Sequence, residues 1–419
     1  MHRRLFLGAA AAMSALPLLP ARAVGGEPVV VDRFTVDRPA SGAVSIGALL
    51  PLSGVDAAFG RMILEAALVA ISEVNRRPGR HRLVLSPFDS QSRANPFADG
   101  LKRLVAAERV VAVLAPVRAE MRAETTAFIE HAGGLLCDPA AYEGGECSRY
   151  VVHCGATPHQ MLKQFIPWLV REAGPRVLMV AGPDALSQEM ARVARAVVGR
   201  VDGEVLGGDA VLDEVVRRLR RDRPDVLFST LSGDAAAQLL RRLEAAGSEA
   251  PMASPFLDER VVATVGPRLA AGAVAVSTWF ATDTSAESAR FVTRLRQHLG
   301  KGAVLTAAAE ATYAQVHLLA EAVDNLGGGD VAAGTVREAI KERHFVAPQG
   351  KVSIEAGSLH ARLWPRIAVV GEGGRFHTVA RSGQPLRGFP YWGRPGVACT
   401  EAGPRLAPPT DLPSREGWD

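Results

Sequence analysis

The sequence predicts an α/β protein made of two doubly wound lobes, each with a mostly parallel sheet covered by helices on both faces. Three observations predict this class. From Val44 onwards, short apolar runs alternate with amphipathic runs, which is the order that βαβ units produce. The same alternation begins again after residue 156. With 419 residues, of which 48% are hydrophobic, the chain is long enough for two or three domains with full cores.

The first alternation starts with a strand over Val44–Leu50, which ends at the turn residues Pro-Leu-Ser-Gly. A helix over residues 57–77 is expected next, because apolar residues from Ile63 to Val74 recur every three or four positions and share one face. The other elements expected in this part are strands over residues 82–87, 110–115 and 134–137 and helices over residues 96–107 and 119–131.

The second alternation contains strands, four shorter helices and then two long helices. In chain order we expect a helix over 160–172, a strand over 176–181, helices over 187–198 and 211–221, a strand over 225–230, helices over 235–246, 286–299 and 307–326, and strands over 351–354 and 366–370. Residues 371–374, Gly-Glu-Gly-Gly, predict a hairpin turn. The tail from residue 393 is rich in Pro and Gly and is expected to be irregular.

The N-terminus has the features of an export signal. Arg3 and Arg4 precede an apolar run over residues 5–19, and Ala-Arg-Ala at residues 21–23 fits a cleavage site. The run is too short to cross a membrane as a stable helix. We therefore expect cleavage after Ala23 and a soluble mature protein outside the cytoplasm. The two arginines are also typical of the twin-arginine route, and the choice between that route and the general one stays open.

The charge of the mature chain argues against a nucleic-acid partner. Removing residues 1–23 takes away three arginines and no acid, so the formal net charge falls from +4 to +1, with 45 basic against 44 acidic residues. A nearly neutral chain with only 5% aromatic residues offers no electrostatic footprint for nucleic acid.

Three of the four cysteines fall within residues 137–158, which raises the question of a metal or catalytic site. The spacing of Cys147 and Cys154 does not match a zinc site. His153 adjoins Cys154, but neighbours on a strand point to opposite faces, which argues against a catalytic dyad. We expect a disulfide or buried thiols. The four cysteines, Cys137, Cys147, Cys154 and Cys399, allow three connectivities, and all three stay open.

No other motif predicts catalysis or a bound cofactor. The chain has no GxxxxGK[ST] phosphate loop, no GxSxG nucleophile elbow and no HExxH zinc motif. The arginines within residues 217–221 fit the solvated face of a helix. We therefore expect a binding protein and not an enzyme, without a metal or cofactor. In doubly wound folds, ligands bind beyond the carboxyl ends of the strands. The residues in such places are Ser53, Arg118, Asp138, Asp184, Thr230 and Trp279.

Several stretches resemble one family of proteins. Residues 46–54, followed by Phe59-Gly60, are similar to the start of periplasmic receptors for branched-chain amino acids. Residues 142–148 and 155–160 resemble the branch of that family that binds urea and short amides. Three later stretches also agree with the family pattern, and the resemblance runs from about residue 44 to about residue 385. These later stretches are residues 225–230, 309–313 and 347–350.

The resemblance implies a type I periplasmic binding fold, in which two lobes joined by three crossings close around a small molecule. It implies a location in the periplasm and an ABC permease, or another inner-membrane transport component, as the partner. The division expected from it gives residues 44–156 and 282–342 to lobe one and residues 157–281 and 343–390 to lobe two. Residues 391–419 form the tail.

Positions that hold the ligand in the family differ in this chain. Ala119 stands where the resemblance implies a serine or threonine, Asp138 where it implies a tyrosine, and Ala140 where it implies a threonine. The tyrosines expected near Asp184 are absent, whereas Thr230 is retained. Each buried polar group left unpaired costs about 1–3 kcal/mol. We therefore expect a ligand other than urea or acetamide.

Three interpretations of the altered pocket stay open. In the first, the pocket is wider and more apolar and holds a lipid- or sterol-like ligand. In the second, Arg118, Glu120 and Asp138 point inward and bind a charged ligand. In the third, these charged side chains lie at the rim of the cleft in water. Trp279 replaces another aromatic residue of the family. The residues predicted to contact the ligand are Ser53, Phe59, Arg118, Ala119, Glu120, Asp138, Tyr142, Asp184, Thr230 and Trp279.

The function that follows is capture of a small molecule and its delivery to an ABC-type transporter. A carrier that moves a lipid- or sterol-like ligand between membranes is one alternative. A hydrolase that uses Cys147 or Cys154 is another, and a ligand-sensing regulator is the third.

Overall fold

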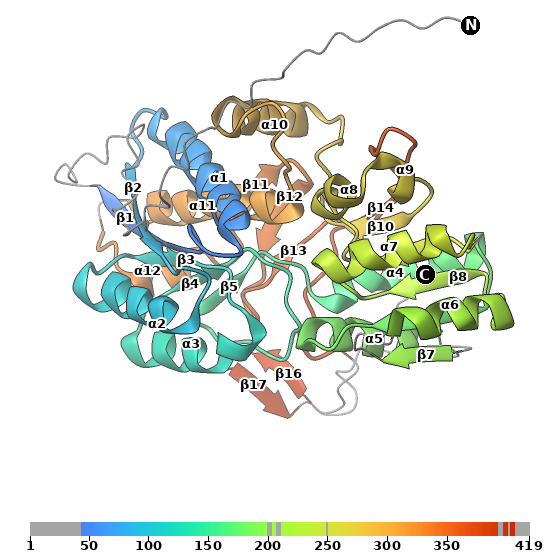
Figure 1. Cartoon of the computed structure of the whole chain (residues 1–419). Helices are drawn as coiled ribbons and strands as arrows, with labels where there is room; N and C mark the ends of the chain where they lie inside the picture. Colours follow the sequence, from blue (N-terminus) through green and yellow to red (C-terminus); the bar gives the residue numbers. More distant parts are fainter. Residues whose placement is uncertain are drawn as a thin grey trace, which may run out of the picture. The chain divides into compact units, whose positions relative to one another are not determined.

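The computed structural model describes residues 43–198, 203–206, 211–248, 250–327, 329–392, 397–400 and 403–406. The predicted export signal, residues 1–23, lies outside these ranges. Most of the described strands belong to two sheets with helices on both faces (Figure 1), which confirms the predicted α/β class.

The first sheet has five parallel strands in the order β2-β1-β3-β4-β5. Its strands are β1 (Val44–Leu50), β2 (Leu83–Asp89), β3 (Ala112–Leu114), β4 (Leu136–Asp138) and β5 (Val151–His153). Its helices are α1 (Ala57–Asn75), α2 (Ala94–Lys102) with the π-helical turn η1 (Arg103–Ala107), α3 (Ala119–Ala132), α10 (Ala286–Leu299), α11 (Ala307–Asn325) and α12 (Ala333–Ala339). The helices α1 and α11 pack on one face, and α2 and α3 pack on the other (Figure 1).

Burial on both faces explains the sequence of β1. All of its residues except Ser45 are buried, as is typical of a central strand covered by two helical layers. Helix α1 starts shortly after this strand and approaches its end closely. A Cβ atom at Gly60 would overlap the carbonyl oxygen of Pro51, so a glycine is required at this position. This close approach brings Phe59 to the carboxyl end of the sheet.

The second sheet has seven strands in the order β15-β14-β10-β9-β8-β6-β7. Its strands are β6 (Val177–Ala181), β7 (Gly203–Leu206), β8 (Val226–Ser229), β9 (Met252–Ser254), β10 (Val274–Ser277), β14 (Arg366–Val370) and β15 (Phe376–Arg381). Its helices are α4 (Pro158–Glu172), α5 (Ala185–Val198), α6 (Val211–Asp222), α7 (Gly233–Ala245), α8 (Glu259–Val265) and α9 (Pro267–Ala270). The strands β6 to β10 run parallel, and the predicted turn at residues 371–374 joins β14 and β15 into an antiparallel hairpin.

The chain passes between the two sheets three times before β14 begins. The connections are residues 154–157, 278–285 and 340–365. The third connection forms a small sheet of its own, with β11 (His344–Ala347), β12 (Gly350–Ile354) and β13 (Ala361–Arg362).

This small sheet changes the predicted division of the chain. The strand β11 packs against α11, and His360 pairs with His153 at the end of β5. Residues 343–362, which the prediction gave to lobe two, therefore lie with the first sheet. We call the first sheet with α1–α3, α10–α12 and β11–β13 the first lobe, and the second sheet with α4–α9 the second lobe.

The tail differs from its prediction as irregular. The strands β16 (Val397–Thr400) and β17 (Gly403–Leu406) form an antiparallel pair. Composition alone favoured a loop because Pro and Gly disrupt regular sheets. The pair nevertheless forms, and a disulfide at Cys399 fixes β16 to another part of the chain.

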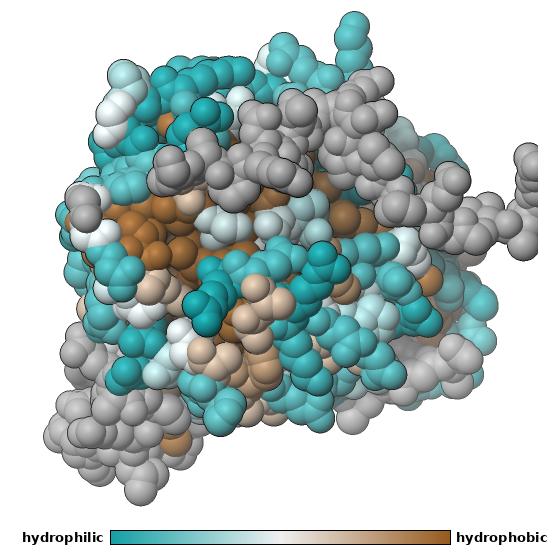
Figure 2. Space-filling view, turned by 90° about the vertical axis from the view of Figure 1, so that its left-hand side faces the viewer, coloured by the Kyte–Doolittle hydropathy of each residue, from teal (hydrophilic) through white to brown (hydrophobic). Residues whose placement is uncertain are grey.

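Figure 2 shows the side on which β1 and β2 lie in Figure 1, with a brown apolar area between teal polar regions and grey atoms over part of this face. Within the described part of the chain, the strongly exposed large hydrophobic residues are Val55, Val346 and Val379. No described helix is both long enough and apolar enough to cross a membrane.

Candidate ligand-binding cleft

A cavity of about 550 Å³ opens at the carboxyl ends of the strands of the first sheet. Its lining comes from the segments that follow β1, β2, β3 and β4, and from the starts of α5 and α8 in the second lobe. The cavity therefore has the location that the parallel-sheet rule predicts. Its volume also lies within the range of about 300–1,000 Å³ that is typical of small-molecule sites.

The structure brings five of the ten predicted residues into this lining. They are Phe59 on α1, Arg118, Ala119 and Glu120 at the start of α3, and Asp184 just before α5. The cavity also contains Ala140, the other position where the resemblance implied a hydroxyl. The two alanines thus present methyl groups at the positions where polar side chains were expected.

The charges beside Ala119 lie at the rim of the cavity. Arg118 forms an ion pair with Glu120 at 2.7 Å and lies 3.9 Å from Asp56. The side chains of Arg118 and Glu120 are 57% and 61% exposed. This exposure favours the interpretation that Arg118 and Glu120 lie at the rim of the cleft in water, because exposed ion pairs remain in contact with solvent.

Two helices begin at the cavity without a side-chain cap. The helix α2 starts after Arg93 and α3 starts after Arg118, and neither of these cap residues accepts a hydrogen bond from its helix through its side chain. Both starts belong to the cavity lining. The first N–H groups of a helix point along its axis and carry partial positive charge, so uncapped starts attract anions.

Asp138, the last residue of β4, lies behind the cavity wall, which corrects its prediction as a ligand contact. Its carboxylate is fully buried and accepts a hydrogen bond from Arg122 Nη1 at 3.0 Å. Burial raises the pKa of this carboxyl, and the nearby Arg122 guanidinium opposes that shift. Arg122 also donates to Glu143 Oε1 and to the Val117 carbonyl oxygen, both at 2.8 Å. A buried carboxylate requires such a partner, and the pairing turns Asp138 away from the ligand space.

Ser53 and Thr230 also lie outside the cavity lining. The hydroxyl of Ser53 donates to Asp89 Oδ2 at 2.6 Å and so holds the loop after β1 to the end of β2. Thr230 is fully buried, and its carbonyl oxygen accepts a hydrogen bond from the Ser187 hydroxyl at 2.7 Å. Both residues shape the loops at the strand ends and are not exposed to a ligand in the cavity.

Tyr142 and Trp279 are core residues and not cavity residues. Both are fully buried. The indole N–H of Trp279 donates to Ser288 Oγ at 2.9 Å, and its ring packs edge-on against Phe291. The ring of Tyr142 stacks on His153 with centroids 4.1 Å apart. Aromatic residues near strand ends were predicted to face a ligand, but they pack against neighbouring rings instead.

Several lining residues were not predicted from the sequence. Three of them, Ser90, Ser92 and Phe97, follow β2. The signal for this segment is its position beyond the carboxyl end of a parallel strand. Leu186 and Arg260 come from the second lobe. The guanidinium of Arg260 lies over the Phe59 ring, 5.3 Å from its centroid, so this pair connects the two sides of the cavity. Nothing in the sequence indicates that Phe59 and Arg260, which are 201 positions apart, lie in contact.

The cysteine-rich stretch forms a disulfide and two buried thiols. Cys147 is bonded to Cys399, with 5.7 Å between their Cα atoms. Cys137 and Cys154 are free and buried, and burial raises the pKa of both thiols well above the usual value. Thiols with raised pKa values stay protonated near neutral pH, so neither is an activated nucleophile.

A protein-family model described as periplasmic binding protein domain matches residues 44–395. Solved structures with the same fold include a solute-binding protein of an ABC transporter from Rhodopseudomonas palustris BisB5 in complex with 3,4-dihydroxybenzoic acid. It is 16% identical, with a TM-score of 0.72, over 82% of this chain and 98% of that chain. A second R. palustris solute-binding protein, in complex with benzoate, is 20% identical with a TM-score of 0.70, over 82% and 98% of the two chains. The branched-chain amino acid binding protein LivJ from Streptococcus pneumoniae, in complex with isoleucine, is 19% identical with a TM-score of 0.69, over 81% and 99%.

Proposed function

We propose, since the chain belongs to the periplasmic binding protein domain family, that it captures a small amphipathic carboxylate between its lobes and delivers it to an ABC-type permease. Residues 1–23 act as the export signal, with cleavage after Ala23, and place the protein in the periplasm. The ligand is a molecule with a compact apolar or aromatic body and one carboxylate.

One observation carries this proposal: the uncapped starts of α2 and α3 open into a cavity that also has an apolar wall. A carboxylate can accept hydrogen bonds from the N–H groups of Ala94 and Asn95 at the start of α2, where Pro96 has none, and from those of the first residues of α3. Arg93 precedes α2, and its guanidinium is paired with the neutral Gln91 side chain, so its positive charge is not cancelled by that partner. These groups together favour an anionic end of the ligand at the first lobe.

The apolar wall supports the other end of the ligand. Phe59, Phe97, Val117 and Met121 come from the first lobe, and Leu186 comes from the second. Burying apolar ligand surface against such side chains contributes about 25 cal/mol for each Å² removed from water. The bound molecules of the structural neighbours, two aromatic acids and an amino acid, have the same combination of a carboxylate and an apolar group.

The replaced hydroxyls argue against urea and short amides as ligands. Such molecules are almost entirely polar, so capture depends on a hydrogen-bond partner for nearly every atom. Ala119 and Ala140 cannot donate or accept through their side chains, and both line the cavity. An unpaired buried group costs about 1–3 kcal/mol, so two lost partners remove most of the affinity for so small a molecule.

A thermal-shift and calorimetric comparison of residues 24–419 tests the proposal. The panel contains benzoate, 4-hydroxybenzoate, isoleucine, acetamide, urea and sterol-containing vesicles. We expect one or more of the carboxylates to raise the unfolding midpoint, because a ligand that binds only the folded state stabilises it by mass action. Benzyl alcohol and benzamide, which keep the ring and lack the charge, are the matched controls. A shift with vesicles alone would favour the lipid carrier, and a shift with urea or acetamide alone would contradict the proposed pocket chemistry.

A further inference from the structure

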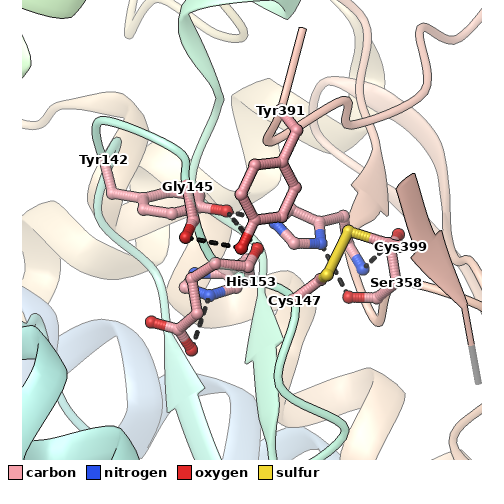
Figure 3. The surroundings of a disulfide bond; sticks show 9 residues. Tyr142, Gly145, Cys147, His153, Ser358, Tyr391 and Cys399 are labelled. Carbon is pink, nitrogen blue, oxygen red and sulfur yellow. Dashed lines mark hydrogen bonds and ion pairs between the residues drawn. A yellow bond between two sulfur atoms is a disulfide. The ribbon is translucent and has the colours of Figure 1, made fainter. Parts of the chain in front are cut away.

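After β15 the chain returns from the second lobe to the first. We call residues 382–392 and 397–400 the C-terminal strap. In the first lobe, Gly145 N donates to the Pro390 carbonyl oxygen at 2.7 Å, and the Tyr391 hydroxyl donates to the Gly145 carbonyl oxygen at 2.8 Å. Figure 3 shows the contact of Tyr391 with Gly145 beside the Cys147–Cys399 disulfide. The strap is therefore fastened to the first lobe by the covalent bond, by these two hydrogen bonds and by an ion pair of Arg387 Nε with Glu355 Oε1 at 2.6 Å.

The same strap rests on two helices of the second lobe. On α4, the His159 ring contacts Phe389 edge-on, with centroids 5.1 Å apart, and lies 5.3 Å from the Trp392 ring. On α5, Arg192 Nη2 donates to the Trp392 carbonyl oxygen at 2.8 Å. Residues 389–392 thus contact both lobes within four positions of the chain.

The attachment point in the first lobe is densely packed. Cys147 is only 3% exposed, and a Cβ atom at Gly144 would lie 2.5 Å from the Pro390 carbonyl oxygen. His153 stacks on the rings of Tyr142 and His360, at centroid distances of 4.1 and 4.7 Å, and those two rings also contact each other. Burial lowers the pKa of His153 to about 3, so the ring is neutral at physiological pH and packs as an aromatic group. A strap bonded here moves with the first lobe.

We propose that Cys147 and Cys399 are positioning residues for ligand capture, because their disulfide makes the strap a fourth connection between the lobes that limits how far the cleft opens. The family match ends at residue 395, so Cys399 lies beyond the matched region. Hinge opening moves α4 and α5 relative to the first lobe, and a strap held covalently at one end and packed at the other resists that displacement. This inference rests on the proposed capture of a ligand between the lobes but does not depend on the ligand class proposed above.

Breaking the disulfide turns the fourth connection into a reversible contact. A dithiol reductant transfers two electrons and two protons: the S–S bond breaks, Cys147 and Cys399 become thiols, and the reductant becomes a disulfide. The noncovalent attachments of the strap to the first lobe then remain, among them the two hydrogen bonds with Gly145 and the Arg387–Glu355 ion pair. These noncovalent contacts can open and close again without breaking a covalent bond. The two lobes of the reduced protein therefore gain a wider range of separations.

Pulsed electron paramagnetic resonance on the ligand-free protein tests this. Spin labels attached through keto amino acids at Ala107, exposed in the first lobe, and Ala245, exposed in the second, report the distance between the lobes without using cysteine chemistry. We expect the distance distribution of Cys399→Ser, of Cys147→Ser and of the dithiothreitol-reduced wild type to be broader and shifted to longer distances than that of the oxidised wild type. Reoxidation of the wild type should restore the narrow distribution.

A control separates strap release from general destabilisation. Cys154→Ala removes a buried thiol that makes no disulfide, and its distance distribution should match that of the oxidised wild type. Far-UV circular dichroism checks that each variant folds, and the reduced wild type covers the case in which a serine variant does not. Identical distributions for oxidised and reduced wild type, with both folded, would overturn the proposal.

Discussion

The two lobes contribute very differently to the cavity. The first lobe supplies the segments after four neighbouring strands, whereas the second lobe supplies only Asp184, Leu186 and Arg260. The first side is also supported by buried polar contacts, notably Arg122 with Asp138, while Asp184 and Arg260 on the second side are exposed. In the proposed function, this contrast assigns recognition mainly to the first lobe and covering of the bound ligand to the second lobe.

The largest effect should come from breaking the buried support of the first lobe. Arg122→Leu leaves the Asp138 carboxylate buried without its cation, which typically costs about 3–5 kcal/mol, reduced to the extent that this carboxyl takes up a proton. The free energy of unfolding from urea titration measures the loss. Arg118→Leu is the matched control, because it lies one turn earlier on the same helix start and removes only exposed ion pairs, with Glu120 and with Asp56, each worth about 0–1 kcal/mol. Equal losses for the two variants would contradict the contrast.

A buried carboxyl in the first lobe should make stability depend on pH. Glu310 on α11 is fully buried and accepts hydrogen bonds from the Gln349 side chain at 2.6 Å and from its backbone N–H at 3.2 Å. Burial raises the pKa of Glu310 to about 7. A folded-state pKa above the unfolded value means that the folded protein binds the proton more tightly. This contribution to stability is therefore complete below about pH 4.5 and is lost as the pH rises through about 7.

Glu310→Gln removes this titration. We expect the difference in the free energy of unfolding between pH 5 and pH 8 to fall by about 1–3 kcal/mol relative to wild type, since each pKa unit corresponds to about 1.4 kcal/mol. Urea titrations at the two pH values give this difference. Glu338→Gln, an exposed acid on α12 whose pKa is lowered by a hydrogen bond from Lys341, is the control and should change the pH dependence in the opposite direction or not at all. An unchanged pH dependence in the Glu310 variant would show that the carboxyl is ionised throughout this range.

The fold could be predicted from the sequence because periodicity reports burial. β1 is buried on both faces and is apolar apart from Ser45 and Gly47, and α1 has an apolar stripe, so element type and order follow from local patterns. Proline and glycine content misled the interpretation of the tail. The strands β16 and β17 pair with each other, and a disulfide between residues 252 positions apart holds β16. Neither the pairing nor the disulfide leaves a signal in the local sequence.

Half of the predicted site residues lie in the cavity, and the reason is geometric. The rule of strand ends places a residue near the ligand space but does not say which way its side chain points. Arg118 and Asp184 point outward from the strand ends and line the cavity, whereas Asp138 and Trp279 stand in equivalent places and turn into the core. That choice depends on distant partners such as Arg122 and Phe291, which the sequence does not connect to them.

Adding hydroxyls at positions 119 and 140 tests whether the first lobe determines ligand specificity. The double variant Ala119→Ser/Ala140→Thr places a donor and acceptor at each of two positions in the lining. A net hydrogen bond contributes about 0.5–1.5 kcal/mol, so we expect acetamide affinity to rise about fivefold to a hundredfold, measured by isothermal titration calorimetry. Ala141→Ser, beside Ala140 in the same lining, controls for added polarity. No gain in acetamide binding would mean that these two positions do not set ligand polarity.

The smallest effect is expected on the second side of the cleft. Arg260→Ala removes the guanidinium over Phe59 and one of the three residues through which the second lobe reaches the ligand space. An exposed cation–π contact is worth about 0.5–1 kcal/mol, so affinity for the carboxylate that binds best in the panel should fall about two- to fivefold. Arg268→Ala, on α9 and paired with Glu244 outside the cavity lining, should leave that affinity unchanged. A loss greater than tenfold for Arg260→Ala would show that the second lobe holds the carboxylate directly, and the contrast between the lobes would then have to be reversed.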